Sequence, residues 1–317
     1  MKILVTGAAG FIASHVADAY VDAGHEVVIV DDLSRGSLRN VNPKAHFYQC
    51  DIRDQGAIEE IFESEKPAIV NHHAAQMDVR RGVREPLFDA DVNILGSLNM
   101  LGAAIAHNVK RFIYIASAGA GYGEPQVNPV GEDHPINPIT PYGISKHTVE
   151  HYLFTLNFLY GLEYAVLRYG NVYGPRQNSQ GEAGVFAIFS EQMLAGVQPV
   201  IYGDGNKVRD YVYISDVVAA NVTALERGTN EIFNIGTGVE TKDLEVFQTV
   251  RSLLGKEVEP KYAPRRPGEI DRICLDISKA ARLLGWVPRI SLTEGARATV
   301  TYFQNRAREP VSISTAA

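Results

Sequence analysis

Cysteine is scarce in this sequence, and long apolar runs are absent. Cys50 and Cys274 are the only cysteines among 317 residues, and their separation along the chain offers no disulfide framework. Two unpaired thiols fit a reducing compartment, so we expect a cytoplasmic protein. No stretch approaches the ~18 apolar residues of a membrane span. Residues 3–5, the apolar stretch before Thr6, are too short for a signal peptide, so we expect no membrane partner.

An excess of positive charge is also missing. The chain has 30 Lys and Arg against 37 Asp and Glu, a formal net charge of -7 and a pI of about 5.7. General affinity for nucleic acid or an anionic membrane requires a basic face, so we expect neither as a partner. Any anionic ligand must therefore be held by local arginines. The 45% hydrophobic content over this length allows a large core, in one elaborated domain or two unequal ones.

Apolar runs of strand length alternate with helical patterns through the first half of the chain. We expect strands near residues 3–5, 27–30, 47–50, 68–70, 112–116 and 164–167, and helices near 11–23, 54–65, 87–107 and 142–160. Continuous apolar strands separated by helices indicate a parallel sheet covered on both faces. The sequence therefore predicts an α/β fold with a doubly wound parallel sheet of the Rossmann type.

The pattern loosens after residue 170. Short strands are expected near 199–202 and 208–214, and helices near 215–227, 242–254 and 291–306. We interpret this part as a smaller, mixed α/β C-terminal domain. We expect the sheet domain to comprise residues 1–170 joined by about 212–235, the smaller domain 171–211 and 236–306, and a flexible tail 307–317.

A glycine loop follows the first expected strand and opens the first expected helix. Gly7, Gly10 and Ala13 have the spacing at which backbone amides and the helix N-terminus can hold a pyrophosphate without side chains in the way. Asp31 ends the second strand, where a carboxylate accepts hydrogen bonds from ribose hydroxyls and repels a 2′-phosphate. We therefore expect NAD rather than NADP, with Arg35 as the nearby residue that could reverse this preference.

Tyr142 and Lys146 form a Tyr-x-x-x-Lys pair. Residues at this spacing lie on one face of a helix, so the ammonium can favour the phenolate and make the tyrosine a base. Thr140 and Pro141 suit the N-cap and first position of that helix. Ionisation at neutral pH requires the phenol pKa to fall by roughly three pH units, about 4 kcal/mol, which Lys146 and a cationic nicotinamide could supply. Ser117 follows an expected strand, where its hydroxyl could share a proton with Tyr142.

Five motifs follow one another along the chain. They are Thr6-Gly7-x-x-Gly10-Phe11-Ile12, a serine before Tyr122-Gly123-Glu124, the Tyr142/Lys146 pair, Leu167-Arg168-Tyr169-x-Asn171-Val172-Tyr173-Gly174-Pro175-Arg176 and Val208-Arg209-Asp210-Tyr211-Val212. Together they resemble the extended short-chain dehydrogenase/reductases that modify nucleotide sugars, and in particular the UDP-glucose (UDP-galactose) 4-epimerase family. The likeness extends to about residue 305. It implies that the sheet domain binds NAD and that the smaller domain binds the nucleotide sugar.

The resemblance also implies roles for individual residues. Ser117, Tyr142 and Lys146 would carry catalysis. The NAD site would comprise Gly7, Gly10, Phe11, Ile12, Asp31, Asp32, Asp51, Ile52, Ala74, Ala75, Gln76, Asn93, Tyr142, Lys146 and Tyr169. The substrate site would comprise Ser117, Tyr142, Asn171, Val185, Tyr202, Arg209, Arg266 and Arg272. Arg265 is a close alternative to Arg266 and Arg272 in the substrate site. The position of Asp51 fits a polar residue at a strand end as well as it fits a cofactor contact.

Two departures from the family pattern bear on the chemistry. Ala13 stands where a third glycine is usual, and one methyl group can be fitted there. Residues 115–119 contain a single hydroxyl, that of Ser117, and another register would put Ala118 in its place. Residues 118–121 carry no carboxylate, whereas elimination of water needs an acid and a base beyond the tyrosine. The sequence therefore predicts inversion at C4 of a UDP-hexose through a 4-keto intermediate.

Other functions stay open at this point. They are 4-epimerisation of UDP-glucuronate or a UDP-N-acetylhexosamine, reduction of a sugar nucleotide, and a catalytically silent NAD-binding regulatory role. Asp31 argues against an NADPH-dependent reductase. The presence of both Tyr142 and Lys146 argues against a silent protein.

His147, Glu150 and His151 match the H-x-x-E-H pattern of certain zinc peptidases. The two histidines point away from the Tyr142/Lys146 face and no third ligand is evident, so we expect no metal. Their stripe continues through Phe154 and Phe158, opposite a second apolar set on the same helix. A helix that is apolar on two faces must bury both. We therefore expect a homodimer that forms through the helices near 87–107 and 142–160.

Overall fold

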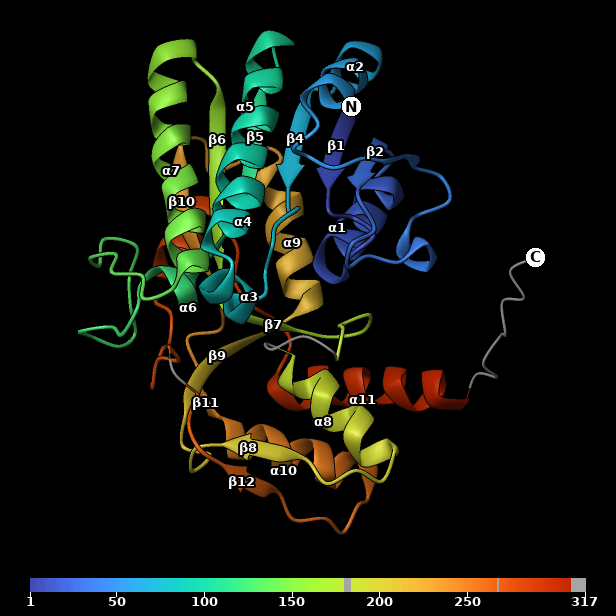
Figure 1. Cartoon of the computed structure of the whole chain (residues 1–317), viewed down its shortest axis with the longest axis vertical. Helices are drawn as coiled ribbons and strands as arrows, with labels where there is room; N and C mark the ends of the chain where they lie inside the picture. Colours follow the sequence, from blue (N-terminus) through green and yellow to red (C-terminus); the bar gives the residue numbers. More distant parts are fainter. Residues whose placement is uncertain (180–183, 267, 309–317) are drawn as a thin grey trace.

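The computed structural model describes residues 1–179, 184–266 and 268–308, and its largest feature is a seven-stranded sheet (Figure 1). The strands are β1 (Lys2–Thr6), β2 (Glu26–Asp31), β3 (His46–Gln49), β4 (Ile69–His72), β5 (Arg111–Ser117), β6 (Glu163–Tyr169) and β10 (Glu231–Ile235). Their order is β10-β6-β5-β4-β1-β2-β3, and every neighbouring pair is parallel. The doubly wound parallel sheet expected from the alternating pattern is confirmed.

Helices cover both faces of this sheet. One face carries α1 (Phe11–Asp22) and α9 (Ile214–Ala224), and the other carries α2 (Gln55–Glu65), α5 (Ser97–Ala106) and α7 (Pro141–Tyr160). Side chains alternate along β1, so that Ile3 and Val5 pack in the first core while Leu4 packs in the second. Because both sides of the central strands are buried, their sequence is a continuous apolar run.

The single helix expected at 87–107 is interrupted. The segment comprises α4 (Pro86–Ala90), a π-helical stretch η2 (Asp91–Gly96) and then α5, and a separate short helix α3 (Val79–Arg84) precedes it. A Cβ on Gly96 would lie 2.8 Å from Cδ1 of Ile52, so this part of the chain packs closely on the segment between β3 and α2. Wide π-type turns inside helices occur frequently at functional sites, and η2 carries Asn93.

A smaller domain lies beyond the carboxyl edge of the sheet (Figure 1). It contains the strands β7 (Asn171–Tyr173), β9 (Val208–Tyr213) and β11 (Glu240–Lys242), and the pair β8 (Val200–Tyr202) and β12 (Lys261–Ala263). Its helices are α8 (Val185–Leu194), α10 (Asp243–Leu254) and α11 (Leu292–Arg308), which share an apolar core with Phe186, Phe247 and Val300. Short helical turns complete the described chain as η1 (Leu38–Asn40), α6 (Ala118–Gly121) and η3 (Ala280–Leu284).

The ends of the smaller domain differ in part from expectation. α8 was not expected: no helix was predicted at 185–194, where α8 begins after its N-cap Gly184. Residues 180–183 lie outside the described chain. The expected tail begins at residue 307, yet α11 extends to Arg308, and residues 309–317 lie outside the described chain. No described helix is long and apolar enough to cross a membrane.

Candidate active site

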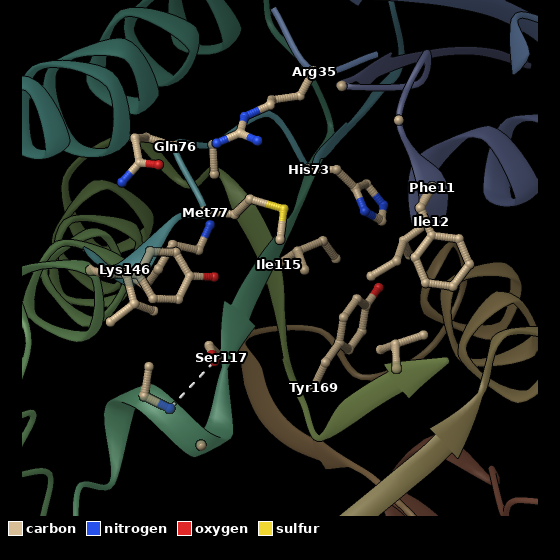
Figure 2. A pocket seen from close by; sticks show the side chains of 18 of the residues that line it. Phe11, Ile12, Arg35, His73, Gln76, Met77, Ile115, Ser117, Lys146 and Tyr169 are labelled. Atoms are coloured by element: carbon tan, nitrogen blue, oxygen red, sulfur yellow. Dashed lines mark hydrogen bonds between the residues drawn. The ribbon is translucent and has the colours of Figure 1, made fainter. Parts of the chain in front are cut away.

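A cavity of about 690 Å³ opens at the carboxyl edge of the sheet, where it meets the smaller domain. Its wall contains the glycine loop, the Tyr142/Lys146 pair, and Arg209 and Arg266 from the smaller domain. Ligands of doubly wound sheets bind at this edge. The fold therefore gathers residues that are far apart in the sequence around one space (Figure 2).

The glycine loop forms a cradle at one end of the cavity. Gly7 has a φ of 73°, and a Cβ there would lie 2.9 Å from the backbone nitrogen of Ala74. Gly10 is the N-cap of α1 and supplies no side-chain cap, so the helix N-terminus is left uncovered beside Phe11 and Ile12 in the wall. Ala13 is also accommodated there, 2% exposed. An uncovered helix N-terminus behind a close glycine turn fits a dinucleotide pyrophosphate.

Asp31 lies in the cavity wall and is held in a fixed orientation. Its oxygens accept hydrogen bonds from the backbone nitrogens of Ala9, at 2.9 Å, and Leu33, at 2.8 Å. Burial raises the pKa of this carboxyl, and the two hydrogen bonds act in the opposite direction. Arg35 also lines the cavity, but its guanidinium pairs with Asp78 at 3.2 Å. This pairing offsets the positive charge that would have favoured a 2′-phosphate.

Asp32, Asp51 and Ile52 also line this end of the cavity. Asp51 pairs with Arg53 at 2.6 Å, and this hydrogen bonding holds the pKa of Asp51 below its ordinary value. The Asp51 carboxylate thus already accepts hydrogen bonds from Arg53, which leaves fewer of its acceptor positions for a ligand.

Asn93 is not part of the cavity wall, although it was expected to contact the cofactor. It is 1% exposed, its Oδ1 accepts from the backbone nitrogen of Gln76 at 2.8 Å, and its Nδ2 donates to the Gln76 carbonyl at 2.9 Å. Ala74, Ala75, Gln76 and Tyr169 do line the wall. Asn93 therefore acts through the Gln76 backbone, because the π-helical turn that carries it lies behind that segment.

The start of α7 aims Tyr142 and Lys146 into the cavity. Thr140 is the N-cap, its hydroxyl accepting from the backbone nitrogen of Gly143 at 3.2 Å, and Pro141 opens the helix as expected. Lys146 is 4% exposed, and its Nζ lies 4.4 Å from the ring centroid of Tyr114. The ammonium therefore faces an aromatic ring as well as the cavity.

Burial dominates the acid–base behaviour of this pair. It raises the pKa of the Tyr142 phenol to about 12, with the charge of Asp89 acting the same way and a hydrogen bond with Ser117 opposing it. Burial also lowers the pKa of Lys146 to about 7, against the charges of Glu150 and Asp89. The phenol of the protein alone is therefore far from ionised at neutral pH, and the expectation that Lys146 and a cationic nicotinamide together lower its pKa stays a prediction. Because burial removes water from both groups, the Tyr142 phenol needs a further positive charge nearby before it can ionise at neutral pH.

Ser117 stands beside this pair. It is the last residue of β5 and lines the cavity, and its Oγ accepts from the backbone nitrogen of Ala120 at 3.4 Å (Figure 2). Ala118, the alternative in the other register, is 0% exposed and packs in a separate apolar cluster. A Cβ on Gly143 would overlap the carbonyl of Ala120, so only a glycine lets α6 approach α7 this closely.

Of the four candidate arginines in the smaller domain, two line the cavity and two do not. Arg209 and Arg266 line the cavity, with Asn171 and Val185 nearby in the wall. Arg272 does not line it, contrary to expectation, because its exposed guanidinium pairs with Glu240 at 2.6 Å. The alternative, Arg265, is also exposed and pairs with Asp271. Tyr202 stands behind Arg266 and outside the cavity wall.

The model of the NAD dependent epimerase/dehydratase family matches residues 3–236. The chain belongs to this family. The UDP-glucose 4-epimerase of Mycolicibacterium smegmatis is 42% identical over 97% of this chain and 100% of its own. The solved UDP-glucose 4-epimerase of Thermotoga maritima with UDP-glucose has a TM-score of 0.96 and 49% identity, covering 97% of this chain and 100% of its own. That of Thermus thermophilus in complex with NAD has a TM-score of 0.92 and 41% identity, covering 96% and 99%.

A cluster of charged residues in the wall, Lys207, Asp243 and Glu269, was not anticipated from the sequence, and neither were Arg53, Arg80 and Arg81. Lys207 Nζ lies 2.7 Å from Oε2 of Glu269 and 3.2 Å from Oδ2 of Asp243. Glu269 also lies 3.9 Å from Arg266. Lys207 lies two residues before Arg209, and Glu269 lies three residues after Arg266. Their closeness to expected site residues could have indicated them, whereas no local feature marked Asp243.

The His147 and His151 rings lie on α7 away from the cavity. Their Nε2 atoms are 3.0 Å apart, and His147 Nδ1 lies 2.9 Å from Glu150 Oε2. Glu150 is also paired with Arg168 at 2.6 Å. In the described part of the chain, no group of three or more His, Cys, Asp or Glu side chains could hold a metal ion.

Proposed function

We propose that this family member is an NAD-dependent epimerase that inverts C4 of a nucleotide-linked hexose, with UDP-glucose and UDP-galactose as its substrate pair. The observation that carries the proposal is the presence of Tyr142, Lys146 and Ser117 in one cavity with the glycine loop, while α6 after Ser117 has no carboxylate. The names of the relatives, which are 41% to 49% identical over nearly the whole chain, support the same substrate.

In the proposed reaction Tyr142 accepts the proton of the C4 hydroxyl as the C4 hydride leaves, which oxidises C4 to a ketone. Bound NAD supplies the hydride acceptor and a positive charge near Tyr142. The 4-keto sugar turns before the hydride returns to its other face, and Tyr142 gives the proton back, so atoms and electrons balance. Ser117 hydrogen-bonds the same oxygen. Lys146 in its ammonium form adds the second positive charge that a phenol of pKa about 12 requires.

We assign the cofactor to the sheet side of the cavity. The Gly7 and Gly10 turn with the α1 N-terminus would hold the pyrophosphate, and Asp31 would accept hydrogen bonds from the ribose. The remaining contacts would come from Phe11, Ile12, Asp32, Asp51, Ile52, Ala74, Ala75, Gln76, Tyr142, Lys146 and Tyr169. Asn93 supports this site through Gln76.

We assign the nucleotide diphosphate to the opposite side. Arg209 and Arg266 would bind it, because a guanidinium can grip a phosphate with paired hydrogen bonds. Asn171 and Val185 would complete the contacts, and Tyr202 would act through Arg266. Arg272 has no part in this assignment, since it lies outside the wall.

An NMR equilibrium assay tests the function. The purified protein with NAD would be incubated in turn with UDP-glucose, UDP-N-acetylglucosamine, UDP-glucuronate and dTDP-glucose. We expect UDP-glucose to yield UDP-galactose, read from the anomeric and H4 signals. Conversion of one of the other sugars alone would replace the proposed substrate, and NAD binding without any conversion would favour a regulatory role.

We also propose that the protein is a homodimer. α7 buries Val149 and Leu153 against the sheet, but leaves Phe154 67% exposed and Phe158 81% exposed on its other side. Leu87 of α4 is 86% exposed. Large apolar patches on a surface usually mark a contact with another chain. A second copy that packs α7 and the α4 to α5 segment in a four-helix contact would cover them.

The division into an NAD-binding unit, 1–170 with 212–235, and a substrate-binding unit, 171–211 with 236–306, is likewise a proposal. Two observations support it: β10 joins the seven-stranded sheet, and α9 packs against α1. The two free cysteines support the cytoplasm as the compartment.

A further inference from the structure

A buried carboxylate lies near the catalytic pair without a role in the reaction proposed above. Asp89, on α4, is 1% exposed. Its Oδ2 accepts a hydrogen bond from Nε2 of Gln76 at 3.1 Å, while its Oδ1 is buried with no hydrogen-bond partner among the described residues. A buried carboxylate with one unsatisfied oxygen is costly, so its presence calls for a reason.

The surroundings hold this carboxylate in place. A Cβ on Gly82 would lie 2.8 Å from Asp89 Oδ2, so α3 can approach α4 only with a glycine at this point. The Gln76 side chain is fixed from its other end, since Oε1 accepts from the Asp78 nitrogen at 2.7 Å and Nε2 donates to the Asp78 carbonyl at 2.8 Å. Asp89 and Asp78 thus fix the side chain of Gln76, which lines the cavity (Figure 2).

Asp89 also acts on the catalytic pair through its charge. α4 packs against α7, which carries Tyr142 and Lys146. Burial is the largest influence on both groups. After it, the Asp89 charge raises the pKa of Tyr142, and the charges of Glu150, first, and of Asp89 raise the pKa of Lys146. For Lys146 this opposes burial, so Asp89 favours the ammonium form.

Asp89 shares its effect on Lys146 with one other carboxylate, that of Glu150. The elements packed against α4 carry further titratable and charged groups: Asp91 on η2, which pairs with Arg53 at 2.7 Å, Arg80, Arg81 and Arg84 on α3, and Tyr142, Lys146, His147, Glu150, His151, Tyr152 and Tyr160 on α7. Tyr114 on β5 and His72 and His73 at the end of β4 lie near the same pair. Burial lowers the pKa of His72 and His73, so both are neutral at pH 7. Glu150 also favours the Lys146 ammonium, and Arg168 and His147 hold its carboxylate at 2.6 Å and 2.9 Å, whereas the Asp89 carboxylate has no cationic partner at hydrogen-bond distance among the described residues.

We propose that Asp89 is a positioning residue for the Tyr142 and Lys146 pair: its carboxylate fixes Gln76 at the cavity wall and, together with Glu150, places negative charge beside Lys146. The contribution of Asp89 to turnover rests on the proposed function. The effect of Asp89 on Lys146 does not depend on that function and can be measured without substrate.

A titration of the full chain measures that effect directly. Asp89→Asn removes the charge while keeping the size and an oxygen for Gln76. Lysine Cε signals are followed by ¹³C NMR against pH, and the Lys146→Ala variant identifies the Lys146 signal. In the wild type we expect its midpoint near pH 7, because burial lowers the pKa of Lys146 to about 7, far below the ~10.4 of ordinary lysines. In Asp89→Asn we expect the midpoint to fall by roughly one pH unit. The control Glu63→Gln, at an exposed carboxylate on α2, should leave it unchanged.

An unchanged midpoint in Asp89→Asn, or an equal shift in the control, would overturn the proposal. If Asp89→Asn does not fold by circular dichroism, Asp89→Ser gives the same test. Loss of the ammonium at lower pH should also move the alkaline limb of the epimerase pH profile downward by about one pH unit, whereas a purely structural role would lower the rate equally at every pH. A midpoint shift without wild-type turnover would refute the proposed function and leave this inference standing; turnover without a shift would do the reverse.

Discussion

The guanidinium of Arg266 lies over the ring of Tyr202, with its central carbon 3.3 Å from the ring centroid. Tyr202 is the last residue of β8, and pairing with β12 fixes the backbone on which the ring stands. A guanidinium stacked on an aromatic face keeps its N–H edge available for hydrogen bonds. Tyr202 therefore serves the cavity by orienting Arg266.

Replacing Tyr202 with leucine should raise the KM for UDP-galactose by roughly 5- to 30-fold, since a desolvated cation–π contact is worth about 1–2 kcal/mol. The kcat should change little, because the reacting C4 lies at the other end of the substrate. The matched variant Tyr202→Phe keeps the stack and should keep the KM. Steady-state kinetics measure both, and an equal loss in the two variants would show that the hydroxyl matters rather than the stack.

The two arginine positions, 266 and 272, should behave differently. Arg266→Ala should raise KM by roughly 10-fold or more, because hydrogen bonds to charged groups contribute about 1.5–3 kcal/mol. Arg272→Ala should stay close to the wild type, since that side chain is exposed and paired with Glu240. UDP affinity measured by calorimetry checks both. An equal loss of UDP affinity in the two variants would show that Arg272 also binds the substrate.

Tyr142→Phe should lower kcat by roughly 10²- to 10⁴-fold, the usual contribution of a positioned acid or base. NAD and UDP affinities and the melting temperature should hold, because the ring still fills its buried place. A coupled assay for UDP-glucose formation measures the rate, and a variant of full activity would remove Tyr142 from the chemistry.

The sheet could be predicted because each central strand carries its own signal. Ile3, Leu4 and Val5 alternate between two cores, so the strand is apolar throughout and short glycine-marked turns bound it. α8 was missed because no N-cap signal precedes it: Gly184 gives no side-chain cap. The break of the 87–107 helix into α4, η2 and α5 depends on the close approach of Gly96 to Ile52, which is a tertiary contact.

The site was predictable where a motif sits on a regular element. Gly7, Asp31 and Tyr142 each follow from the strand or helix that carries them, and all three line the cavity. Arg272 was misplaced because its position on a connecting segment leaves its direction to local partners, here Glu240. Asp89 gave no signal at all, since its importance arises only when α4 packs on α7.

The exposed apolar side of α7 should hold the dimer together. Phe158→Glu, or Phe154→Glu with it, should shift the protein from dimer to monomer at micromolar concentration, because burying a charge in an apolar contact is costly. Leu283→Glu, at an apolar residue that is 45% exposed on η3, is the control and should leave the mass unchanged. Light scattering coupled to gel filtration reads the mass. A wild-type monomer would contradict the proposed dimer at once.

Lys146 should cost the protein stability in a manner that depends on pH. Its pKa is about 7 in the folded protein and ~10.4 in an unfolded chain. Between these values the unfolded chain retains a proton that the folded protein has released, so this residue makes the free energy of unfolding rise with pH. Below pH 7 the cost of the buried ammonium is on the order of 4–5 kcal/mol. Lys146→Met should therefore melt above the wild type at pH 6.5, and the difference should shrink by pH 9.5. Comparing the two proteins at each pH removes the contribution of the other titratable groups, which they share. A difference in melting temperature that stays constant with pH would mean that Lys146 is not desolvated in the folded state.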